Sequence, residues 1–171
     1  MKSRLLAFLA IAVIFTAIGV TALAAQEEGE SGGSTFGKSD GPSGLKWTGG
    51  NMGSSLMNPG TNCIACHSAG EGPRFSAAGT VYSKLDEKSL DLGVKGATVV
   101  ITDAKGKVVK LETNKAGNFF ARGLTFAFPI HAKVTYEGKT RAMMGGKSSA
   151  NCAVCHTQTG VGGAPGRIMI P

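Results

Sequence analysis

Residues 97–113 read Ala-Thr-Val-Val-Ile-Thr-Asp-Ala-Lys-Gly-Lys-Val-Val-Lys-Leu-Glu-Thr, and this stretch decides the fold class. Its first part, 97–102, is rich in β-branched side chains, which favour a strand. The next part, 103–107, combines Asp, Lys and Gly and has the composition of a tight turn. Residues 108–113 then return with Val, Leu and Thr, so the whole stretch predicts a β-hairpin.

Similar short segments flank this hairpin on both sides. Further strands are expected at 79–82, from 119 onward, at 130–136 and at 140–144. Several short strands at this spacing are typical of an all-β sandwich. We therefore expect a mainly β protein, with a small Greek-key β-sandwich over residues 75–144 and short helical or loop segments at both ends.

Three pieces of this region resemble a known family. Residues 79–81 (Gly-Thr-Val), 93–99 (Gly-Val-Lys-Gly-Ala-Thr-Val) and 113–119 (Thr-Asn-Lys-Ala-Gly-Asn-Phe) look like the carboxypeptidase regulatory-like domain. The resemblance implies a transthyretin-like, immunoglobulin-like β-sandwich in the middle of the chain. That family carries no catalytic residues to transfer, so the resemblance implies a fold and a generic role in display, adhesion or packing.

The N-terminus has the three parts of a secretory signal peptide. A cationic start at 1–4 is followed by an apolar run at 5–20 and by small residues at Ala22 and Ala24 that fit a cleavage site. We expect residues 1–25 to be a signal peptide, with an uncleaved membrane anchor as the alternative. Export to the periplasm or the outer surface follows, with no stable membrane insertion once the signal is removed.

A Gly/Ser-rich stretch at 26–50 separates this signal from the rest of the chain. Its composition is typical of a flexible tether and not of a packed element. Trp47, near its end, is the only Trp, and we expect it to pack at the edge of the core or over the first cofactor.

All four cysteines fall in two matching pentapeptides, 63–67 (Cys-Ile-Ala-Cys-His) and 152–156 (Cys-Ala-Val-Cys-His). Cys-x-x-Cys-His is the attachment signature of a c-type haem. Two intervening residues let both thiols reach one edge of the porphyrin, and the adjacent His is carried under the iron as the proximal ligand. We expect two haem c groups, with binding residues Cys63, Cys66, His67, Cys152, Cys155 and His156.

Other chemistries of the cysteines are less compatible with this pattern. A four-cysteine zinc site uses Cys-x-x-Cys pairs but leaves the His after each pair unexplained. Structural disulfides suit an oxidising compartment, yet a Cys-x-x-Cys bridge closes only a small loop. A thioredoxin-like redox pair needs a βαβ context, which the pattern of short strands does not supply.

The two attachment segments, 51–74 and 145–171, repeat each other beyond the pentapeptide. Asn62 and Asn151 precede the cysteines, and Asn is a good N-cap, so each segment is expected to open a short helix. Gly-Pro stretches follow each motif and let the backbone pass close to a cofactor. Arg74 and Arg167 occupy similar places, each as a propionate partner or as a solvated surface residue.

The ligand on the distal side of each iron is less determined. His131 is the one His outside the motifs, and the alternation of 130–136 points it away from the core. It is the leading distal candidate, for a haem of its own chain or of a neighbouring one, against the alternative of a solvent-exposed His. The weaker candidates are methionines, each of which is more often a packing residue than a ligand, and they are Met143, Met144, Met57, Met52 and Met169.

The net charge of +7 argues for a basic protein, but Lys2 and Arg4 fall in the expected signal, which leaves +5. Haem propionates would lower this further, and the basic residues form no stripe, so a nucleic-acid partner is not expected. We expect an electron carrier that meets redox partner proteins, and not an enzyme. The alternatives are a haem enzyme or ligand sensor with one open iron, or a homo-oligomeric or polymeric subunit of an extracellular cytochrome assembly.

Overall fold

The computed structural model describes residues 54–70 and 72–171, so the expected signal (1–25), the tether (26–50), Trp47 and Met52 lie outside the described residues. None of the helices in this range is long and apolar enough to cross a membrane. The elements in chain order are α1 (Cys63–Ala69), β1 (Phe75–Tyr82), β2 (Thr98–Thr102), β3 (Val108–Glu112), β4 (Asn118–Arg122), β5 (His131–Tyr136), β6 (Lys139–Ala142), the 3-10 helix η2 (Cys152–Val154) and β7 (Ile168–Met169).

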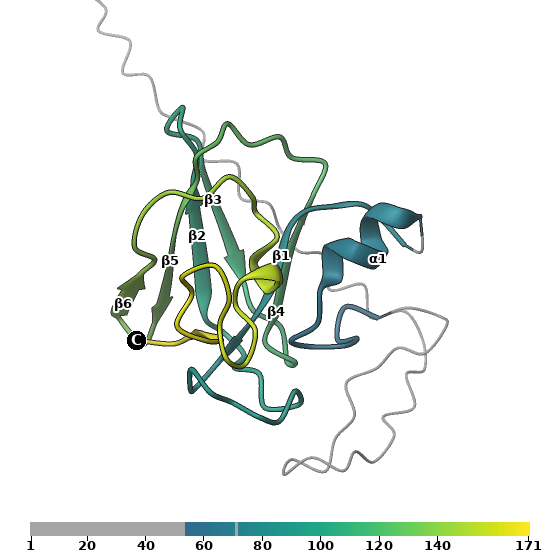
Figure 1. Ribbon diagram of the computed structural model, residues 1–171, viewed down its shortest axis with the longest axis vertical. Helices are drawn as coiled ribbons and strands as arrows, with labels where there is room; N and C mark the ends of the chain where they lie inside the picture. The colour runs from purple at the N-terminus through teal and green to yellow at the C-terminus, as the bar shows by residue number, and fades with distance from the viewer. Residues whose placement is uncertain (1–53, 71) are drawn as a thin grey trace, which may run out of the picture.

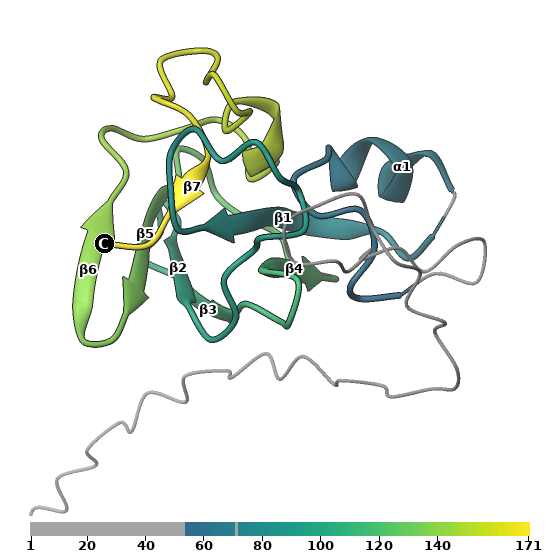
Figure 2. The same ribbon diagram turned by 90° about the horizontal axis from the view of Figure 1, so that it is seen from below.

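The strands form two sheets, which confirms the prediction of a mainly β sandwich (Figures 1 and 2). One sheet has the order β4-β1-β7 and the other the order β3-β2-β5-β6. All neighbours are antiparallel except β1 and β7, which run parallel. Consecutive strands cross between the sheets at β1 to β2, β3 to β4, β4 to β5 and β6 to β7, and the hydrophobic faces of the two sheets meet in one core.

The core between the sheets follows the alternation of the predicted hairpin. In β3, Val109 and Leu111 are buried, whereas Val108 and Lys110 are exposed. Successive side chains of a strand point to opposite faces, so this pattern turns one face of β3 inward. The same rule holds in β5, where Val134 is buried. The core residues are Ala77, Val81, Ala97, Val99, Ile101, Val109, Leu111, Phe119, Ala121, Phe126, Ile130, Val134 and Ala150.

Strand β1 differs because it is buried on both faces. Ala77 and Val81 face the core, yet Ala78 and Tyr82 on the opposite face are each only 1% exposed. The outer face is covered by the chain before α1, by the loop after β1 and by the chain before β7. The amide of Gly60 donates to Thr80 Oγ1 at 2.8 Å, for example.

Strand β7 was not predicted from the sequence. It pairs in parallel with the end of β1, with Val81 opposite Ile168 and Tyr82 opposite Met169. The amide of Ile170 continues this ladder by donating to the carbonyl of Tyr82 at 3.0 Å. The C-terminal residues therefore contribute a strand to the sandwich.

The turn of the predicted hairpin is organised by Asp103. Its Oδ1 accepts from the amides of Lys105 and Lys107, each at 2.9 Å, and its Oδ2 accepts from the amide of Ala127 at 3.0 Å. These bonds, led by that from Ala127, hold the pKa of the Asp103 carboxyl below its usual range. The side chain thus ties the β2–β3 turn to the chain before β5.

Replacing Asp103 with Asn removes the charge and one acceptor, so the variant should unfold at a lower urea concentration than the wild type at pH 7. Because the carboxyl pKa is lowered by folding, its stabilisation is present above pH 3.8 and is lost as the pH falls through the folded-state value. Between pH 7 and pH 3, the free energy of unfolding should therefore fall less in the variant than in the wild type. Asp86→Asn, in an exposed loop, is the control, and equal pH slopes in all three proteins would contradict this role.

Candidate functional site

The first motif forms the short helix α1. The side chain of Asn62 accepts from the amide of Ala65 at 3.2 Å, which caps the helix as predicted. The helix ends at Gly70, whose φ of 98° is the left-handed conformation that glycine adopts at little cost. Both cysteines and His67 therefore lie on a single two-turn element, and none of its residues is buried.

His67 is held by the chain that follows the helix. Its Nδ1 lies 2.9 Å from the carbonyl oxygen of Pro73. A carbonyl oxygen can only accept, so Nδ1 carries the proton and Nε2 carries the lone pair of the neutral ring. The ring also stacks on Phe75, with centroids 3.9 Å apart and an angle of 14° between the planes.

The stack continues beyond Phe75. Phe120 of β4 lies behind Phe75 at 4.7 Å between centroids, and the guanidinium of Arg122 sits 5.2 Å from the Phe120 centroid. These rings restrict the rotation of the His67 imidazole by packing against one of its faces. The Pro73 carbonyl fixes the orientation of the imidazole through the hydrogen bond at its Nδ1 edge.

The second motif has a different local structure but the same histidine bond. Cys152–Val154 forms a 3-10 helix, and Asn151 makes no capping bond with its side chain. The prediction of an Asn cap is therefore wrong at this site. His156 Nδ1 nevertheless lies 2.9 Å from the carbonyl oxygen of Gly166, so the proton is again on Nδ1.

The bond between each motif histidine and a backbone carbonyl suits a metal-binding role. Histidines that bind a metal through Nε2 commonly donate their other ring N–H to a backbone carbonyl, which fixes the tautomer and the ring orientation. Both motif histidines do so, and no disulfide joins any of the four cysteines. The donor set fits two covalently held haems, one at Cys63, Cys66 and His67 and one at Cys152, Cys155 and His156. A haem would supply one-electron redox chemistry at each.

A buried hydroxyl beside the second motif also fits a bound group. Thr157 Oγ1 is buried and has no hydrogen-bond partner within residues 54–70 and 72–171. A buried polar atom of this kind is normally satisfied by water or by a bound molecule. Thr157 directly follows His156 in the sequence.

The fold brings the two motifs together, a point that the sequence left open. Asn151 Nδ2 donates to Asn62 Oδ1 at 2.9 Å, although the two residues are 89 positions apart. Figures 1 and 2 both show α1 and the turn with η2 next to each other beside β1. Burial raises the pKa of the Cys152 thiol to about 12, and the charge of Cys63 in the first motif is the next cause.

Burial acts in the same direction on Cys63, the first cysteine of the first motif. It raises the pKa of the Cys63 thiol, while a hydrogen bond to the backbone opposes this change. The Cys63 sulfur lies 3.5 Å from the carbonyl oxygen of Thr61, and the Cys152 sulfur lies 3.5 Å from that of Ala150. The two motifs therefore share this contact as well.

The two arginines that follow the motifs have different surroundings. Arg74 is exposed, which agrees with its interpretation as a solvated surface residue. Arg167 is only 6% exposed, and its guanidinium donates to the carbonyls of Gly60 and Glu87 and lies over the ring of Tyr82. Arg167 is therefore not a solvated surface residue, because its side chain ties the chain before α1 to the loop after β1.

Three buried polar residues, Thr80, Asn114 and Asn118, hold the chain that leads into the first motif. From the sequence they had been assigned only to turns and strands. Asn114 and Asn118 donate through their side-chain amides to the carbonyl of Ser55, at 2.6 and 3.3 Å, and Asn118 also donates to that of Met57 at 3.0 Å. Thr80 donates to Asn118 Oδ1 at 2.8 Å. The asparagines of the turn at 114–118 were visible in the sequence, but their partners lie about sixty residues away.

The distal candidates are dispersed. His131 begins β5, is exposed and points away from the core, as predicted, and Figures 1 and 2 show β5 across the sandwich from α1. Its Nε2 is 3.3 Å from the position that a β-carbon at Gly146 would take, on the chain leading to the second motif. Met57, Met143 and Met169 are half-buried, and Met144 is 92% exposed.

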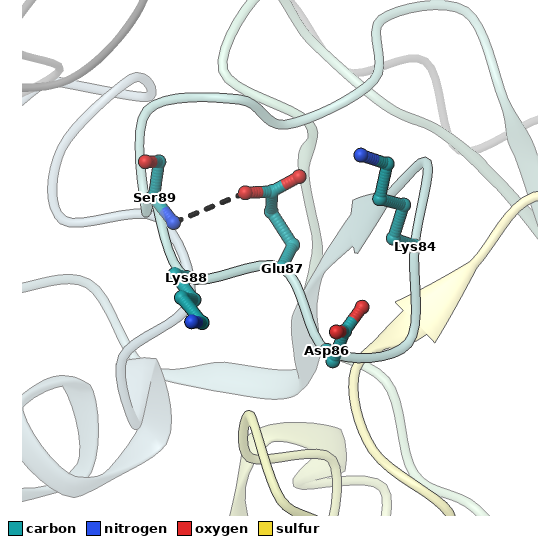
Figure 3. Close-up of a pocket in the computed structure, with 5 residues that line it drawn as sticks. All are labelled: Lys84, Asp86, Glu87, Lys88 and Ser89. Carbon is teal, nitrogen blue, oxygen red and sulfur yellow. Dashed lines mark hydrogen bonds between the residues drawn. The ribbon is translucent and has the colours of Figure 1, made fainter.

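An open hollow lies elsewhere, on the loop between β1 and β2 (Figure 3). Glu87 accepts there from the amide of Ser89 at 3.1 Å, and the exposed side chains of Lys84, Asp86 and Lys88 complete the lining. The side chains carry both charges and include none of the expected ligands. We assign this hollow no part in the site.

No family model, curated protein or solved structure matches this chain. The resemblance of residues 75–144 to the carboxypeptidase regulatory-like domain therefore stays a prediction. Within residues 54–70 and 72–171, no three His, Cys, Asp or Glu side chains gather into a group that could hold a metal ion.

Gly72→Ala tests how His67 is held. A β-carbon at Gly72 would lie 2.7 Å from both Nδ1 and Cε1 of the imidazole, so the ring must shift and its bond to Pro73 should weaken. Overpacking of this kind costs about 1–3 kcal/mol. The ¹⁵N shifts of the His67 ring should change, whereas those of His156 serve as an internal control. Unchanged shifts at His67 would contradict the arrangement.

Proposed function

We propose that this protein is an exported c-type cytochrome that carries two haems and transfers electrons. The observation that carries the proposal is the repeated histidine bond. In two segments with different local structure, the His that ends a Cys-x-x-Cys-His motif donates from Nδ1 to a backbone carbonyl at 2.9 Å and keeps Nε2 for a metal.

Electron transfer is favoured over catalysis because of where the motifs lie. The residues of α1 and η2 are exposed or half-buried, with Cys152 packed against the core, so cofactors held there would be partly reachable from the surface. A haem that activates a small molecule needs a shaped distal pocket with placed polar groups. Surface attachment instead suits short-range exchange with another redox protein, and no acid or base is needed for that reaction.

The proposed partners and location follow from the sequence. Residues 1–25 have the pattern of a signal peptide, which supports a proposed location of the mature chain in the periplasm or on the outer surface. The partners would be redox proteins, and a second copy of the chain is included among them because His131 is exposed. No nucleic-acid partner is proposed.

The haem content tests the proposal directly. Protein matured in a host with haem-attachment machinery should contain two covalent haems per chain, measured by the alkaline pyridine spectrum and by mass. Cys63→Ser with Cys66→Ser, and separately Cys152→Ser with Cys155→Ser, should each leave one haem, and each pair is the control for the other. Purified protein without haem would refute the proposal.

His131→Ala tests the distal ligand. If the imidazole of His131 binds an iron, its loss should convert one low-spin ferric signal to high spin in the electron paramagnetic resonance spectrum. A chain that uses the His131 of a second copy should also lose self-association in the same variant, measured by sedimentation. Lys133→Ala, two positions along β5 on the same face, is the matched control, and an identical spectrum for all three proteins would remove His131 as a ligand.

A further inference from the structure

A hydrogen bond between two asparagine side chains, 89 positions apart, joins the two motifs. Asn151 Nδ2 donates to Asn62 Oδ1 at 2.9 Å, and Asn62 Oδ1 also accepts from the amide of Ala65. We call this pair of side chains the asparagine clasp. Both residues directly precede the first cysteine of their motif, so the clasp links the two attachment points at equivalent positions.

Asn151 has no other evident use for its side chain. It makes no capping bond within its own segment, and its Oδ1 is buried without a hydrogen-bond partner among the described residues. A buried polar atom without a partner is costly, so an Asn held in this way needs a compensating role. The bond to Asn62 is the one interaction of its side chain that the structure shows.

The backbone around the clasp holds it against β1. The amide of Ala78 donates to the carbonyl of Ala150 at 3.3 Å, and Asn151 forms an isolated parallel bridge with Ala78. On the same strand, a β-carbon at Gly79 would lie 3.1 Å from Cβ of Cys152. The second motif is thus seated on β1 at close range, and the clasp joins the first motif to it.

From these contacts we infer that Asn62 and Asn151 are positioning residues that set the separation of the two haem sites, so that the haems form one electron-exchanging pair within a single chain. The inference rests on the proposed function. The exchange moves one electron from the ferrous iron of one site to the ferric iron of the other, with no bond made or broken and no proton moved. Redox proteins outside the chain supply the first electron and accept the last.

Two substitutions remove the clasp from opposite sides. Asn151→Ala deletes the donor and leaves the cap of α1 in place. Asn62→Ser keeps an N-cap, because Ser caps helices about as well as Asn, but its shorter side chain does not reach Asn151. Agreement between the two variants separates loss of the clasp from local damage to either motif. Ser68→Ala is the control, since Ser68 lies beside His67 and its hydroxyl donates to the carbonyl of Ala65, within the same helix.

The measurement is made on the oxidised and half-reduced full-length holoprotein, with the haem content determined first. Electron paramagnetic resonance should show dipolar coupling between the two ferric irons in the wild type and in Ser68→Ala. Both clasp variants should keep two haems but lose most of this broadening, and their two reduction potentials should become less dependent on each other. If one clasp variant fails to fold or mature, the other still gives the result.

The outcomes separate the two claims. Absence of covalent haem would overturn the proposed function and the inference with it. Two haems without coupling in the wild type would overturn the inference and leave the proposed function standing. Coupling that is equal in the wild type and in both clasp variants would show that the asparagines do not set the separation.

Discussion

The structure depends on β1 being covered along both faces and paired along both edges. Its inner face packs into the core through Ala77 and Val81, and β4 and β7 take its two edges. The outer face is closed by the chain before α1 and by Arg167, whose guanidinium lies 5.2 Å from the centre of the Tyr82 ring. Because buried backbone and buried hydroxyls need partners, covering β1 requires the chain on either side of the sandwich to return to it.

Both motifs sit on loops that start and finish at this strand. The first loop is anchored to β1 at Gly60, whose amide donates to Thr80, and it runs into the start of the strand at Phe75. The second leaves at Ala150 and returns at Ile168, both along the β7 edge. Because both loops are anchored on one strand, the two motifs come within reach of each other. The asparagine clasp then joins them at equivalent positions.

The hairpin and the strands were predictable because local alternation decides them, as Val109 and Leu111 show. The motif cysteines and histidines were equally visible, since their chemistry lies in adjacent residues. What could not be predicted were interactions set by tertiary contact. β7 is only two residues long, and its pairing with Val81 depends on the whole sandwich being in place. Arg167 resembled a surface arginine because its partners, Gly60 and Glu87, are at least eighty residues away.

The two histidine bonds show which feature of the repeated segments is physically required. His67 bonds to a carbonyl six positions on and His156 to one ten positions on, yet both distances are 2.9 Å. The extra residues of the second loop are taken up by a turn in which Gly160, with a φ of 72°, donates to the carbonyl of Thr157. Glycine reaches this left-handed conformation without strain, so the loop can lengthen while its ends stay on β1. A longer loop without this turn would have displaced the carbonyl from the histidine. Since the same bond is present in both loops, we infer that both segments are constrained by the orientation of the imidazole.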